Sequence, residues 1–313
     1  MVNTLDYLPL LLLFVDYSSD FFAPTIPKQD ELGIYLILQL RDRIRHLDLN
    51  LPPSILHKVL VLVDETFPIL EHLSLSRMFS ADSGHLSHRL PLTLPKGFLA
   101  PNLRHLTLFD IGPPKRLRML TSTVSLVTLT LSRIQTSGYF RPRLLVARLR
   151  TLPLLEELTI EFAIPIPRPS TERELLGEGG ATITLPGLKT LGFKGVGAYL
   201  ESLVAQIRVP LLEQLHIWLF NQIAFVLPHL FYLINITTTF KLSSARVSFR
   251  HDEVRVYITD GFGRIPFYLC VRCKSLDWQI DCATQIRDEL IPALSCVENL
   301  ELYNCCAAYR AAN

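Results

Sequence analysis

The chain has 313 residues and is close to neutral, with 31 Lys and Arg against 29 Asp and Glu and a formal charge of +2. This balance lacks the basic excess that is typical of nucleic-acid binding, so we expect no nucleic-acid partner. A hydrophobic content of 49% with 19% charged residues is ample for a large core and excludes a disordered chain.

The first forty residues contain two predicted elements. Residues 8–15 (LPLLLLFV) predict a repeat strand; the run lacks a basic leader and is too short to span a bilayer. Residues 29–41 (QDELGIYLILQLR) predict a helix that leads to the next strand. We assign 1–40 to an incomplete first repeat of the series that follows.

From residue 41 onward, a start residue recurs with apolar partners three and five positions later. The start residues are Ile44, Leu70, Leu103, Leu126, Leu155, Leu188, Leu212, Ser244, Cys273 and Val297. They lie 23 to 33 residues apart, about 28 on average, which is the period of leucine-rich repeats with their L-x-x-L-x-L signature. Residues at the third and fifth positions are two apart on a strand, so both face one side, and we expect that side to point inward.

The gaps between these strands contain helical patterns at 52–64, 141–153, 197–210 and 282–294. We expect these segments to form an outer layer, each returning the chain to the next strand. The predicted fold is an α/β leucine-rich-repeat solenoid of about ten irregular repeats, with a curved parallel sheet inside and helices outside. It comprises one domain over 1–313, with repeats over 41–303 and a C-terminal tail over 304–313.

The stretch 214–240 contains no Asp, Glu, Lys or Arg and allows two interpretations. It is long enough for a membrane anchor, but its histidine, asparagine and proline residues are costly in hydrocarbon. The repeat pattern instead predicts a strand over 215–219 and a buried outer helix over 223–234. We favour the repeats and expect no membrane partner; membrane association through 214–240 is the weaker alternative.

All six cysteines lie in the last 44 residues, unlike the spread of a disulfide scaffold, so we expect free thiols in the cytoplasm or nucleus. Cys270 and Cys273, followed by Cys305 and Cys306, have the composition of a zinc site. Residues three apart on a strand face opposite sides, which favours buried thiols instead. No hydrolase, metalloprotease or phosphate-loop motif occurs, and we expect no catalysis, cofactor or metal.

Strand residues between the inward positions should form the concave, partner-binding face of a repeat protein. The residues that we assign to this face are His46, Asp48, His72, His105, Thr107, Thr130, Glu157, Thr159, His216, Arg246, Asp277 and Glu301. A trio of histidines beside Asp48 also has the composition of a metal or pH-sensing site. Ordinary solvated strand residues are the favoured interpretation of most members of the face.

Several phrases resemble the leucine-rich-repeat region of fungal F-box proteins, the large set typical of mushroom-forming fungi. They are RDRIRHLDLNLP (41–52), FPILEHLSL (67–75), LPKGFLAPNLRHLTL (94–108), LPLLEELTI (152–160) and VPLLEQLHIWLFNQIAFVLPHLFYLINIT (209–237). The resemblance implies a substrate receptor of a ubiquitin ligase, in which an F-box docks on the Skp1 adaptor of a cullin complex and the repeats bind a protein.

The resemblance covers the repeats of this family but not its F-box. It should begin with a phrase such as L-P-x-E-[IL], whereas 8–15 already resembles a repeat strand. We therefore expect a protein partner on the concave face, and Skp1 only if an F-box lies upstream. The alternative is a stand-alone repeat scaffold without a role in ubiquitin ligation.

Overall fold

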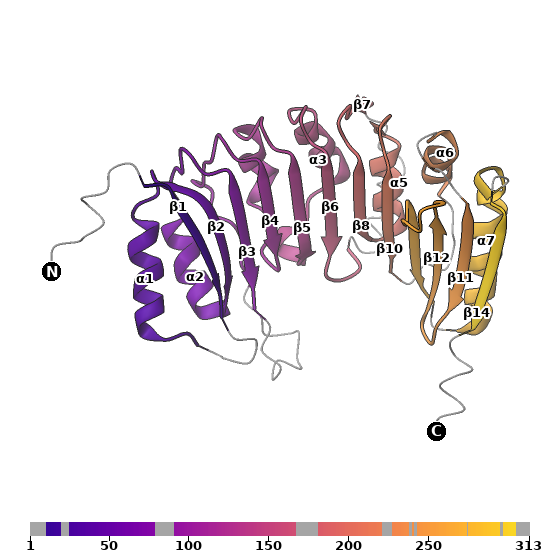
Figure 1. The fold of residues 1–313 in the computed structure, drawn as a ribbon, viewed down its shortest axis with the longest axis horizontal. Coiled ribbons are helices and arrows are strands. Elements are labelled where there is room, and N and C mark those ends of the chain that lie inside the picture. The colour runs from indigo at the N-terminus through magenta and orange to yellow at the C-terminus, as the bar shows by residue number, and fades with distance from the viewer. Residues whose placement is uncertain are drawn as a thin grey trace, which may run out of the picture. The chain divides into compact units, whose positions relative to one another are not determined.

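The computed structural model describes residues 11–19, 25–78, 91–166, 181–220, 227–237, 240, 243–273, 275–294 and 297–304. The chain is an α/β protein whose strands are mostly parallel (Figure 1). Contacts divide it into two compact units: unit 1 comprises Met1–Phe140 and Thr151–Leu155, and unit 2 comprises Arg141–Arg150 and Glu156–Asn313. The assignment of repeats within one domain stays a prediction.

Among its described residues, unit 1 contains five parallel strands that are neighbours in chain order. They are β1 (Leu13–Ser18), β2 (Ile44–Leu51), β3 (His72–Arg77), β4 (His105–Phe109) and β5 (Thr128–Ile134). The helical elements are α1 (Lys28–Leu38), α2 (Pro53–Leu62) and the 3-10 turns η3 (Lys115–Thr121) and η4 (Thr136–Gly138). Helices α1 and α2 pack against each other, as Figure 1 shows. The helices predicted at 29–41 and 52–64 are therefore confirmed.

Strand register explains the core of unit 1. The residues at the third motif position, Leu47, Leu73, Leu106 and Leu129, lie opposite one another on adjacent strands, and all are fully buried. The fifth positions form a second buried row in the same way. A single strand has no such neighbour for its leucines, so the motif is stabilising only when strands stack. Burial of each aliphatic side chain contributes about 1.5–3 kcal/mol.

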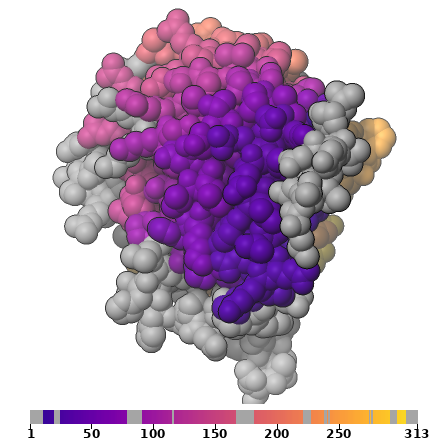
Figure 2. Space-filling model, turned by 90° about the vertical axis from the view of Figure 1, so that its left-hand side faces the viewer, coloured from indigo at the N-terminus to yellow at the C-terminus, as the bar shows by residue number. Residues whose placement is uncertain are grey.

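The side of unit 1 formed by β1 and α1 is turned towards the viewer in Figure 2, in indigo. Phe14 of β1 is 67% exposed, and Leu32 of α1 is 60% exposed. Residues 8–10 of the predicted strand over 8–15 lie outside the described residues, and β1 begins at Leu13.

In the described part of unit 2, seven strands of the sheet follow the order β6, β8, β10, β13, β12, β11 and β14. They are β6 (Glu157–Phe162), β8 (Thr190–Gly195), β10 (Gln214–Leu219), β11 (Ser244–Phe249), β12 (Glu253–Thr259), β13 (Phe267–Arg272) and β14 (Asn299–Asn304). Strand β12 is antiparallel to both β11 and β13; the other neighbours are parallel. A separate pair, β7 (Ile183–Thr184) and β9 (Ile207–Arg208), is parallel.

The helices of unit 2 include those predicted at 141–153, 197–210 and 282–294. They are α3 (Pro142–Leu149), α5 (Gly197–Val204), α6 (Pro228–Ile236) and α7 (Leu276–Leu294). Each packs against the next, and Tyr199 of α5 packs its ring on Phe162 of β6 and Phe193 of β8, with centroids 4.9 and 5.7 Å away. This contact marks the helix side of the sheet. Glu201 of α5 accepts hydrogen bonds from the first backbone N–H groups of α6, at His229 and Leu230.

The uncharged stretch 214–240 contains β10 and the nine-residue helix α6. The predicted strand over 215–219 is therefore confirmed, and the described part of the predicted helix over 223–234 is helical from Pro228. Within the described ranges, every helix is too short or too polar to cross a lipid bilayer.

One predicted repeat is wrong. The segment starting at Cys273 does not form a strand, because α7 begins at Leu276. Ser275 caps this helix: its hydroxyl accepts a hydrogen bond from the N–H of Trp278 at 3.3 Å. The sequence analysis missed the hairpin of β12 and β13, whose turn is held by the Asp260 carboxylate, which accepts bonds from the N–H groups of Phe262 and Arg264.

The last motif forms β14, but its leucines do not face a core. Leu300 and Leu302 are 59% and 69% exposed, although they occupy the third and fifth motif positions. Helix α7 packs on α6, β12 and β11 rather than on β14. The predicted tail over 304–313 lies outside the described residues except for Asn304.

Two leucines at the same motif position test this difference. Leu191 of β8 is fully buried, so Leu191→Ala is expected to lower the free energy of unfolding by about 2–5 kcal/mol through lost burial and a residual cavity. Leu300→Ala is expected to change it by less than about 1 kcal/mol. Urea denaturation monitored by circular dichroism measures both. Equal costs would contradict the exposed placement of Leu300.

Candidate functional site

The side of unit 1 opposite the leucine rows carries a row of aromatic and polar side chains. Phe14, His46, His72, His105 and Thr128 lie opposite one another across β1 to β5. A second row, two residues further along each strand, is Asp16, Asp48, Ser74, Thr107 and Thr130. All six residues predicted for this face in unit 1 therefore lie on one side of one sheet.

The imidazole rings form a stack that follows from the strand spacing. The rings of His46 and His72 are 4.1 Å apart between centroids and inclined by only 10°. The His105 ring lies 5.8 Å from His72 at 39°, and the Phe14 ring lies 6.1 Å from His46 at 24°. Parallel strands bring in-register side chains within about 5 Å of one another, so flat rings at matching positions are held face to face.

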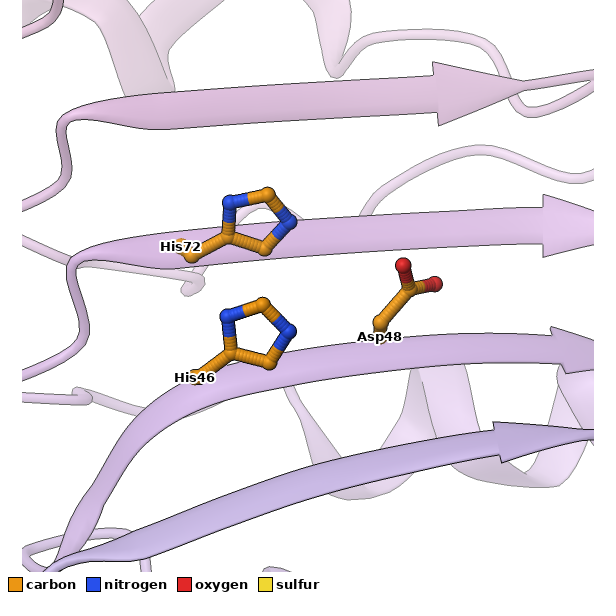
Figure 3. Close-up of side chains that lie close together, drawn as sticks. All are labelled: His46, Asp48 and His72. Atoms are coloured by element: carbon orange, nitrogen blue, oxygen red, sulfur yellow. The ribbon is translucent and has the colours of Figure 1, made fainter.

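Asp48 completes a cluster with the first two rings. It follows His46 by two residues on β2 and therefore faces the same side. His46, Asp48 and His72 each offer one ligand atom, and these atoms lie within 4.8 Å of one another. Figure 3 shows one nitrogen of each ring turned to the side on which Asp48 lies. His105 lies outside this cluster, and its Nδ1 is 3.2 Å from the Thr128 hydroxyl.

The surroundings of His72 favour the neutral form of its imidazole ring. Burial lowers the pKa of His72 because it disfavours the charged imidazolium, and the adjacent His46 and His105 lower it further. Asp48 acts in the opposite direction without reversing the shift. A neutral imidazole keeps one nitrogen lone pair free to accept a hydrogen bond or to bind a metal ion.

In unit 2 the corresponding face has a continuous row across all seven strands. In sheet order, the row is Thr159, Gly192, His216, Tyr268, Tyr257, Arg246 and Glu301. Glu157 lies on the same face, opposite Thr190. Arg246 Nε donates a hydrogen bond to Glu301 Oε2 at 2.9 Å, and both side chains are exposed.

Two predictions about this face need correction. Asp277 lies in the first turn of α7 and not on a strand, so it does not belong to the face. Arg246 and Glu157 each follow the start residue of their motif by two positions, which predicts the same row for both, but Arg246 lies in the row of Thr159 and His216. The missed hairpin of β12 and β13 lies between β10 and β11 and shifts the register of β11 by two residues.

The hairpin also adds aromatic residues that the sequence analysis missed. The Tyr268 ring lies 4.7 Å from Trp218 and 4.9 Å from Tyr257, and His216 approaches it edge-on at 6.4 Å. Arg255 borders the group, pairs with Glu253 and donates a hydrogen bond from Nη1 to the Tyr257 hydroxyl. The apolar–polar alternation of EVRVYIT (253–259) is the signal that was available for β12. We call His216, Trp218, Tyr257 and Tyr268 the aromatic cluster.

Cys270, Cys273 and Cys282 are free, buried thiols. Cys270 lies on the same face of the sheet as Trp218 and Arg255, its register partners on β10 and β12. Its thiol donates a hydrogen bond to Glu253 Oε2 at 3.3 Å. Cys273 instead contacts Cys282. The two cysteines do not converge, and Cys305 and Cys306 lie outside the described residues. Among the residues that the structure describes, the histidine cluster of His46, Asp48 and His72 is the group that can hold a metal ion.

The Cys270 environment makes its thiol unreactive. Burial and the neighbouring Glu253 carboxylate raise the pKa of Cys270 to about 12. Because the thiolate is the nucleophile, iodoacetamide at pH 8 is expected to alkylate Cys270 on the order of 100-fold more slowly in the folded chain than in guanidinium. Peptide mass spectrometry at timed intervals measures both rates. Equal rates would show that the thiol is accessible in the folded chain.

Comparison of the chain with protein-family models, with curated proteins and with solved structures found no match.

Proposed function

We propose that this chain is a protein-recognition module that binds a partner protein through the strand faces of its two units. The observation that carries the proposal is the strand face of unit 2, on which the half-buried rings of His216, Trp218 and Tyr257 pack against the buried Tyr268 ring, beside the exposed Arg246–Glu301 pair. Tyrosine, tryptophan and arginine are the residues that most often dominate binding energy at protein interfaces. A surface of this composition is suited to a protein and lacks the basic excess that nucleic acid requires.

The proposed fold family is the leucine-rich repeat. Support comes from the motif period and from the parallel, in-register strands that most motifs form, with leucines buried on the helix side. The hairpin of β12 and β13 is an insertion in this scheme. The curved shape and the count of about ten repeats remain part of the proposal.

The more specific proposal is a substrate receptor of a ubiquitin ligase in the cytoplasm or nucleus. It depends on the resemblance of the repeat phrases to fungal F-box proteins, and it requires an F-box upstream of Met1 for Skp1 binding. The second candidate is a recognition scaffold without a ubiquitin ligase. Co-purification of Skp1 with the product of the complete gene separates the two, because the scaffold has no reason to bind the adaptor.

Charge reversal tests the strand face directly. The double variant Glu157→Lys/Arg246→Glu changes two exposed positions on the face of unit 2, and we expect recovery of the bound partner to fall at least about tenfold, because loss of one dominant contact costs about 1.4 kcal/mol or more. The matched control is Asp277→Lys, which reverses an acidic charge on α7 away from the face. Quantitative affinity capture from cells compares the three proteins.

Circular dichroism and thermal melting establish that the three proteins are equally folded. Loss of the partner in the face variant alone supports the proposal. Identical partner recovery from wild type, face variant and control would show that the strand face of unit 2 does not bind the partner.

A further inference from the structure

The histidine cluster of unit 1 has a chemistry that protein recognition alone does not require. Two imidazoles and one carboxylate, all half-buried, bring their ligand atoms within 4.8 Å of one another. We propose that His46, Asp48 and His72 bind a divalent transition-metal ion such as Zn²⁺ on the strand face of unit 1. The proposal is independent of the proposed function, because the free chain can bind the ion without a partner.

The backbone fixes the three ligands before any ion arrives. His46 and His72 are directly opposite each other on paired strands, and Asp48 follows His46 by two residues on the same side. Their Cα positions are therefore held by the hydrogen bonds of the parallel ladder. Only side-chain torsions remain to be adjusted, and the half-buried side chains have room for this on the side away from the helices.

The required adjustment is small and has a definite direction. Zinc binds nitrogen and oxygen ligands at about 2.0–2.2 Å, so its tetrahedral ligand atoms lie about 3.3 Å apart. The lone pairs of two rings inclined by 10° run almost parallel, so the rings must tilt towards each other to share one ion. Both rings already turn a nitrogen to the side of Asp48 (Figure 3). An ion bound by all three groups would therefore lie between the two rings and the Asp48 carboxylate.

The ligand types select the class of ion. Imidazole nitrogen suits Zn²⁺, Cu²⁺, Ni²⁺ and Fe²⁺, whereas Ca²⁺ prefers six to eight oxygens and Mg²⁺ keeps a shell of oxygens and water. Three protein ligands leave at least one coordination position for water or for a donor atom from a bound molecule. That open position is on the face that carries the other polar rows of unit 1.

His105 supplies a matched control within the same row. Its ring is adjacent to His72, at 5.8 Å, but it is outside the cluster, and it contacts the Thr128 hydroxyl. A site made by His46, Asp48 and His72 should therefore tolerate His105→Ala. Non-specific binding to exposed histidines should weaken for His105→Ala as much as for the cluster variants.

The test uses the purified full chain after treatment with EDTA and gel filtration. Titration calorimetry with ZnCl₂ is expected to give one equivalent of bound ion, and visible absorption of the Co²⁺ form is expected to show the intense bands of a low-coordinate site. His46→Ala, His72→Ala and Asp48→Asn are each expected to raise the Kd at least tenfold, since loss of an outer-shell partner alone commonly costs about 10–100-fold. His105→Ala is expected to leave the Kd within about twofold, and excess Mg²⁺ or Ca²⁺ should not compete.

Circular dichroism confirms that each variant is folded, and Asp48→Asn preserves the shape of the side chain. The proposal is overturned if wild-type protein binds no Zn²⁺ at micromolar concentration, or if His105→Ala weakens binding as strongly as the cluster variants. It is equally overturned if all variants bind like wild type. None of these results affects the partner-capture experiment on unit 2, so the two proposals fail separately.

Discussion

The in-register pairing of parallel strands is the constraint on which the rest of the structure depends. Because each strand meets its neighbour at matching motif positions, leucines such as Leu73 and Leu106 join into buried rows on one side. Polar and aromatic side chains join into rows on the other side. The parity of a residue along its strand therefore decides whether it stabilises the core or lies on the candidate binding face, and a slip of one residue would exchange the two. Core and site are opposite sides of one ladder.

Much of this arrangement follows from local pattern. The period of the motif predicted β2 to β6, β8 and β10, and the helical patterns between them predicted α2, α3 and α5. The row of His46, His72 and His105 could be predicted from the motif alone, because residues at the same position of successive motifs become neighbours in the sheet. Long, repeated signals of this kind are reliable because each copy imposes the same register on the next.

The parts that sequence analysis missed depend on contacts between distant segments. The segment after Cys273 matches the motif, but the hydroxyl of Ser275 caps a helix there, and one degenerate motif cannot outweigh a helix start. The register of Arg246 could not be derived without knowing that a hairpin separates β10 from β11. Likewise, the 10° inclination of the His46 and His72 rings is a property of packed side chains, which spacing alone does not specify.

Strand order in unit 2 departs from chain order after β10. Strand β8 pairs with β6 and β10 pairs with β8, both in chain order, but the next neighbour of β10 is β13, which follows β11 and β12 in the sequence. Strands β11 and β12 are therefore synthesised before β13, the strand that connects them to β10. The backbone edge of β10 stays unpaired until β13 has been synthesised and pairs with it, and an open strand edge of this kind exposes a nascent chain to aggregation.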